Sequence, residues 1–194
     1  MSRTAFLRLE WLMSLGLTAL AACWAVLRGL PLAGPLTPTI GTVVGGVASG
    51  AALWATIPLL LRSASMRQVW ERVLLPFSRA LDTRDIVVLA LLSGFSEELF
   101  FRGVLLPELG LVASSLCFGA LHALCAVYAA WAALIGAGFG ALALAGGSLV
   151  PPIVAHATYN FGALLLLRRS ALATIPEATT GDARAAIASP HGIG

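Results

Sequence analysis

Residues 86–107 read IVVLALLSGFSEELFFRGVLLP, an apolar stretch of membrane-spanning length with Glu97, Glu98 and Arg102 at its centre. About 20 predominantly apolar residues are enough to cross a bilayer as a helix. A charged side chain in the middle of such a helix costs roughly 2.5–3.5 kcal/mol on insertion scales. Three charges in one span therefore indicate a functional site buried in the membrane.

The composition of the whole chain is that of a membrane protein. Of the 194 residues, 59% are hydrophobic and 11% are charged, with a mean hydropathy of +0.92. The apolar runs are continuous rather than alternating, which favours helices over membrane β-strands. We predict an all-α fold, a polytopic transmembrane helical bundle of about six spans, near residues 9–28, 39–61, 85–106, 110–127, 128–146 and 149–167.

The positions of the arginines predict the orientation of the bundle. They gather before the first expected span, in the polar connection at 62–84 and after the last span, while Arg28 lies in a loop of opposite parity. The positive-inside rule then places both termini in the cytoplasm of a multi-pass protein of a bacterial inner (cell) membrane. The net charge of +3 says little about nucleic acid, and we expect no nucleic-acid partner.

The first apolar segment has a second interpretation, a signal peptide with a lipoprotein-like cleavage site at residues 20–23. Its apolar run of 17 residues, Trp11 to Leu27, exceeds the usual 7–15, so we expect a retained span.

Residues 65–81 show apolar side chains at three- and four-residue intervals, which predicts an amphipathic cytoplasmic helix. The helix would lie on the membrane surface or pack against the bundle. We divide the chain into amino-terminal membrane helices with this connector (1–84), a catalytic helical core (85–169) and a flexible cytoplasmic tail (170–194).

The three charges of the central span differ in their predicted roles. Glu98 and Arg102 are four residues apart, so they share one helix face and can form an ion pair. Glu97 is rotated by about 100° on the same turn. The carboxylate without a cationic partner is the one suited to accept a proton, so Glu97 is the candidate general base. The alternative is a structural ion-pair cluster that fixes helix packing.

Three further polar residues lie in the later apolar segments. His156 and Asn160 are four apart and can direct two hydrogen-bond donors to one point, as an oxyanion hole requires. His122 is a candidate orienting group. The alternatives are a packing histidine for His122 and an interhelical polar clamp for the other two. Together the residues supply a base, an orienting group and oxyanion donors, enough to hydrolyse an amide through an activated water.

The three motifs, in this order, resemble the CPBP family of membrane proteases over about residues 85–167. They are Glu97-Glu98-x-x-x-Arg102, Phe118-x-x-x-His122 and His156-x-x-x-Asn160. The family comprises type II CAAX-prenyl-endopeptidase-like and bacteriocin-processing proteins and is also called Abi. The resemblance implies an intramembrane endopeptidase in which Glu97 and His122 activate water and His156 and Asn160 stabilise the oxyanion. Glu98 and Arg102 carry over as the second glutamate and the arginine of the first motif.

The resemblance implies a membrane protein or a lipidated or bacteriocin-like peptide as substrate; the sequence specifies neither the cleavage site nor the oligomeric state. We favour a mechanism without cofactor. Glu97, His122 and His156 would be the ligands if zinc were used, but no H-E-x-x-H motif is present. Two other functions use the same residues, a proton-coupled carrier and a non-catalytic membrane scaffold or immunity protein.

Overall fold

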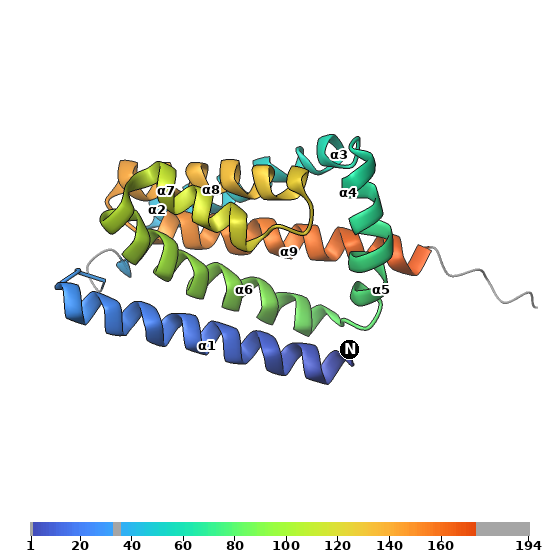
Figure 1. Ribbon diagram of the computed structural model, residues 1–194, viewed down its shortest axis with the longest axis horizontal. Coiled ribbons are helices and arrows are strands. Elements are labelled where there is room, and N and C mark those ends of the chain that lie inside the picture. The colour runs from blue at the N-terminus through green and yellow to red at the C-terminus, as the bar shows by residue number, and fades with distance from the viewer. Residues whose placement is uncertain (1, 33–35, 174–194) are drawn as a thin grey trace, which may run out of the picture.

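The computed structural model describes residues 2–32 and 36–173 of the chain. Every regular element in these residues is a helix, which confirms the all-α prediction. The long helices run side by side as a bundle (Figure 1). The elements are α1 (Arg3–Arg28), α2 (Ile40–Trp54), α3 (Ile57–Leu60), α4 (Ala64–Val69), the π-helical turn η2 (Trp70–Leu74), α5 (Leu75–Ser78), α6 (Thr83–Phe100), the π-helical turn η3 (Phe101–Leu105), α7 (Leu106–Leu121), α8 (Ala126–Gly146) and α9 (Val150–Ala173).

Within the described residues, five helical stretches are long and apolar enough to cross a membrane: α1, residues 40–60, residues 83–121, α8 and α9. The stretch 83–121 corresponds to two of the six predicted spans, because Gly110 breaks it with a φ of +79°. After Gly110 the chain turns back, and the rest of α7 packs against α8 and η3.

The helix predicted over 110–127 ends early, at Leu121. His122 leaves the helical conformation, and its ring bonds the carbonyl of Phe118, one of the carbonyls that a helix end exposes. The last helix, in contrast, continues beyond the predicted Leu167 to Ala173. Most of the predicted tail, residues 174–194, lies outside the described residues.

One end of the bundle joins α1, α6 and α9. The start of α1, the segment α3–α5 and the end of α9 all lie there (Figure 1). Asp82 and Asp85 form a capping box at the start of α6. Arg3 of α1 bonds both carboxylates, at 2.7 and 2.6 Å, and Arg168 of α9 donates to Thr83 Oγ1 at 3.2 Å. The ends of three helices are therefore fixed relative to one another.

Helix α9 lies against both α2 and α6, and glycines allow these close approaches. A Cβ atom at Gly94 of α6 would lie 2.9 Å from the backbone nitrogen of Ala157, and one at Gly50 of α2 would collide with the carbonyl of Ala155. Small residues at helix contacts are the usual means of tight packing in membranes. This packing sets the rotation of α9 and so the direction of His156 and Asn160.

The amphipathic connector predicted over 65–81 is helical from Ala64 to Ser78, as α4, η2 and α5. Its apolar side packs on the bundle: Met66 is buried, and the ring of Phe77 lies 4.0 Å, between centroids, from that of Phe6 in α1. The sequence left open whether this helix lies on the membrane surface or packs against the bundle. The structure shows that its apolar side packs against the bundle.

Each π-helical turn ends two residues before a proline, Pro76 after η2 and Pro107 after η3. Proline has no N–H, and its ring collides with the carbonyl four residues earlier, so the preceding turn widens. The widened turn η3 contains Arg102. The proline two residues after it thus affects the helix at the position that carries the buried cation.

Candidate active site

Glu98, Arg102 and His156 form a polar cluster inside the apolar core. Glu98 is 0% exposed, and the other two residues are 5% exposed or less. Arg102 Nη1 donates to Glu98 Oε1 at 2.8 Å, and His156 Nδ1 lies 2.7 Å from the same oxygen. Because an ionised carboxylate only accepts hydrogen bonds, His156 carries a proton on Nδ1. Glu98 therefore fixes both the orientation and the tautomer of His156.

The guanidinium of Arg102 is enclosed by groups from other elements. Its Nη2 donates to the carbonyl of Gly136 in α8 at 2.8 Å. The ring centroids of Phe118 and Phe139 lie 4.6 and 5.5 Å from its central carbon, within the range of cation–π attraction. A Cβ at Gly136 would lie 3.2 Å from Nη2, so glycine leaves room for the bond. Arg102 thus connects α8 to Glu98 of α6.

Glu97 and His122 form the second pair, which is more open. The two side chains are 20% and 28% exposed, and Glu97 Oε2 lies 3.5 Å from His122 Nε2. His122 Nδ1 is 2.8 Å from the carbonyl of Phe118, so Nδ1 carries the proton and the ring stacks on the Phe118 ring. In neutral His122, Nε2 is then a hydrogen-bond acceptor, and it faces the carboxylate of Glu97, which is also an acceptor. The two groups can bond each other if they share a proton, or both can accept hydrogen bonds from a third group.

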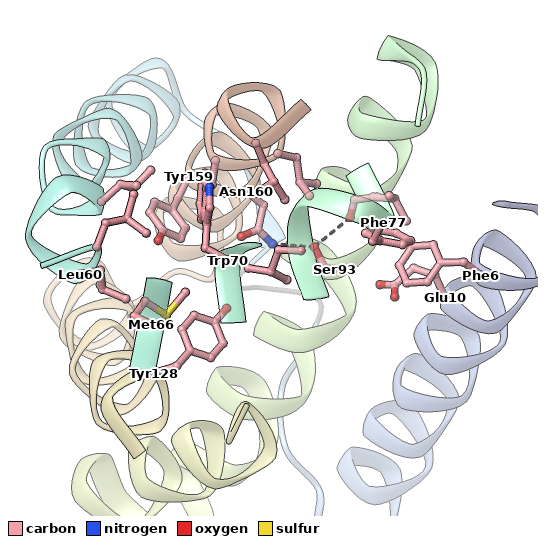
Figure 2. Close-up of a pocket in the computed structure, with 17 residues that line it drawn as sticks. Phe6, Glu10, Leu60, Met66, Trp70, Phe77, Ser93, Tyr128, Tyr159 and Asn160 are labelled. Atoms are coloured by element: carbon pink, nitrogen blue, oxygen red, sulfur yellow. Dashed lines mark hydrogen bonds between the residues drawn. The ribbon is translucent and has the colours of Figure 1, made fainter. Parts of the chain in front are cut away.

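Asn160 is held by a residue of α6. Its Nδ2 donates to Ser93 Oγ at 2.9 Å, and Ser93 Oγ donates to the carbonyl of Leu89 at 2.8 Å (Figure 2). Since the hydroxyl proton of Ser93 is used on Leu89, Ser93 must accept from Asn160, and this fixes which side-chain atom of Asn160 is nitrogen. One N–H of the carboxamide remains to donate elsewhere.

A cavity of about 90 Å³ joins these groups. It is lined by His122, His156 and Asn160, with aromatic rings from α8 and α9 around them. A cavity of this size with polar partners has room for water. Glu97 does not line this cavity, but it contacts His122, which does. The fold therefore brings together residues of α6, of the C-terminal end of α7 and of α9 that lie up to 63 positions apart, Glu97 to Asn160.

The zinc set considered above, Glu97, His122 and His156, is not arranged as a metal site. Within the described residues no group of three or more His, Cys, Asp or Glu side chains is placed to hold a metal ion. His156 bonds Glu98 rather than converging with Glu97, and His122 donates to a carbonyl.

Sequence reasoning missed the residues that hold the site in place, among them Ser93 and Gly136. The signal for Ser93 was its position, four residues before Glu97 and thus on the same helix face. No local signal marks Gly136 as an acceptor for Arg102, because that contact joins positions 34 residues apart.

Residues 80–162 match the model of the type II CAAX prenyl endopeptidase, Rce1-like, family. Residues 80–162 are an Rce1-like domain. The match confirms the resemblance to CPBP proteases, and the Rce1-like domain contains all six predicted site residues. No curated protein and no solved structure matches the chain.

The Rce1-like domain supports a CAAX-protease-like enzyme. Together with the apolar helices of membrane-spanning length, it makes the chain a multi-pass membrane protein.

Proposed function

We propose that this protein is an intramembrane endopeptidase that hydrolyses a peptide bond of a membrane-associated polypeptide with a glutamate-activated water and no metal ion. The observation that carries the proposal is the opposition of Glu97 Oε2 and His122 Nε2 at 3.5 Å, with the other ring nitrogen engaged by a carbonyl. Two acceptors that face one point suit a water molecule, which has two protons to donate.

Water held in this way would direct a lone pair away from both acceptors, toward the carbonyl carbon of a bound substrate. As the oxygen attacks, one proton passes to Glu97 and the carbonyl oxygen becomes an oxyanion. When the tetrahedral intermediate collapses, the C–N bond breaks and Glu97 returns the proton to the leaving nitrogen. Glu97 thus acts first as base and then as acid, and His122 positions the water throughout.

Asn160 and His156 support the oxyanion in this proposal. The free N–H of Asn160 donates to it directly. His156 already donates from Nδ1 to Glu98, so its Nε2 can donate to the oxyanion only when the ring is an imidazolium. Glu98 and Arg102 then act as positioning residues.

The substrate in this proposal is a membrane protein or a lipidated or bacteriocin-like peptide cut near the bilayer. Candidates are prenylated C-termini, bacteriocin leaders and C-terminal sorting helices. We propose a bacterial cell membrane as the location, with both termini cytoplasmic. Arg3 and Arg168 lie at one end of the bundle and Arg28 at the end of α1 remote from Arg3, as the positive-inside rule requires (Figure 1).

The test is a comparison of membrane-protein termini in cells that carry the wild type or Glu97→Gln. Glutamine preserves the shape of the side chain but cannot take the proton, so we expect a folded protein and the loss of specific new termini. Termini that persist in the variant would eliminate Glu97 as the base. An unfolded variant would favour the scaffold function, and transport without cleavage would favour the carrier.

A further inference from the structure

A second cavity, of about 250 Å³, adjoins the candidate active site on the side of α1 and the connector (Figure 2). Its wall is mostly apolar and includes Phe6, Trp70 and Phe77. Tyr128, Tyr159 and Asn160 line both this cavity and the smaller one that contains the two histidines. A side chain bound in the larger cavity would therefore belong to a residue close to the bond presented to Asn160. This inference rests on the proposed function.

Among the described residues, Glu10 is the one acidic residue in the wall of this cavity. It extends from α1 beside Phe6, across from Ser93 (Figure 2). Within the described part of the chain it makes no hydrogen bond or ion pair, and its carboxylate lies close enough to Glu97 for the two to repel. An unpaired carboxylate in apolar surroundings is costly, and a cationic partner relieves that cost.

The charges around the two cavities are unequal. Arg102 is paired with Glu98 and also attracts Glu97, which contacts His122, while Glu10 has no cationic partner among the described residues. The same helix carries Arg3, Arg8 and Arg28, but Arg3 is bound to Asp82 and Asp85 and Arg28 pairs with Glu108. Arg8 is exposed and does not line the cavity. The unbalanced charge of the joined cavities is thus negative.

The aromatic wall favours the same kind of occupant. The faces of Phe, Tyr and Trp rings attract ammonium and guanidinium groups, and more strongly where water is excluded. Lysine and arginine also carry a long apolar stem, which suits a cavity with apolar walls and a single carboxylate.

We propose that the Glu10 cavity is a specificity subsite that binds a lysine or arginine side chain of the substrate, next to the cleaved bond. Glu10 pairs with the cationic group, and the aromatic rings contact the stem. The enzyme then selects membrane-associated polypeptides with a basic residue at one fixed position relative to the cut.

The experiment uses the purified full chain in liposomes and a set of fluorogenic apolar peptides. Each peptide carries one lysine at a successive position, and its partner carries norleucine, which has the same four-carbon stem without the ammonium group. At one position we expect lysine to be cleaved about tenfold or more faster than norleucine. Glu10→Gln should remove this difference, and Glu10→Lys should transfer the preference to peptides with glutamate at that position.

Glu71→Gln is the matched control, because Glu71 is exposed on η2 and is absent from the cavity wall. It should keep the lysine preference. Equal cleavage of lysine and norleucine peptides at every position, or a preference that survives Glu10→Gln, would overturn the proposal.

Binding to the Glu97→Gln variant separates this proposal from the proposed function. Fluorescence anisotropy with the same labelled peptides measures affinity without cleavage. A lysine preference that depends on Glu10 supports the subsite even if the wild type cuts no peptide, a result that would count against the peptidase. Peptides that bind equally with lysine and norleucine would count against the subsite alone.

Discussion

Replacing Arg102 by methionine should strongly destabilise the protein, because Glu98 would keep its charge without its cation. Glu98 is 0% exposed, and Arg102 Nη1 donates to it at 2.8 Å. Breaking a buried pair by removing one partner costs about 3–5 kcal/mol. Methionine fills much of the same space, so the loss is chiefly electrostatic. That is a large fraction of the roughly 5–15 kcal/mol by which proteins are stable.

The assay is the free energy of unfolding of purified protein in mixed micelles, measured by denaturant titration. The double variant Glu98→Gln/Arg102→Met should recover most of the loss, because a neutral amide needs no cation and can still accept from His156. The coupling between the two substitutions is therefore predicted to be large.

Arg28→Met is the matched control. Arg28 also pairs with a glutamate, Glu108, at 3.1 Å, but its side chain is 60% exposed. Exposed pairs contribute little, so we expect no measurable loss. The reasoning is refuted if Arg102→Met costs no more than Arg28→Met, or if the double variant is no more stable than Arg102→Met alone.

Three further predictions concern the site and its packing. Ser93→Ala removes the hydroxyl that holds Asn160, so cleavage should fall by about tenfold or more while the fold is retained; unchanged kinetics would remove Ser93 from the positioning role. Activity of the purified protein should survive exhaustive chelation, and a loss that zinc reverses would require new roles for both histidines. Gly94→Ala should cost about 1–3 kcal/mol of unfolding free energy, because the new methyl would lie 2.9 Å from the Ala157 nitrogen. Gly138→Ala, with no atom within 4 Å, should be neutral or stabilising, and equal effects of the two would contradict the packing argument.

Much of the fold could be predicted from the sequence because membrane helices are recognised by the length and continuity of their apolar stretches. The breaks were harder to place. Gly110 was correctly expected to lie at a boundary, but the early end at Leu121 depends on the His122 ring bonding a carbonyl. Nothing in the hydropathy of 109–167 distinguishes that end from a continuing helix.

In the candidate site, contacts within one helix could be predicted from the sequence, and contacts between helices could not. The pair of Glu98 and Arg102 follows from helical spacing and is present at 2.8 Å. The bond from His156 to Glu98 and the enclosure of Arg102 by Phe118 and Phe139 follow only from the packing of separate helices. The spacing of residues in the sequence therefore identified the polar residues of the site. It did not identify which residues of different helices contact one another.

The central claim is that Glu97 takes a proton from water in the hydrolytic step. Its most direct test is the cleavage rate of purified Glu97→Gln in liposomes, on a peptide that the wild type cuts, with unfolding curves recorded in parallel. We predict a variant as stable as the wild type and slower by about 10²–10⁴-fold, the contribution of a general base. A folded variant that cleaves within tenfold of the wild-type rate would contradict it.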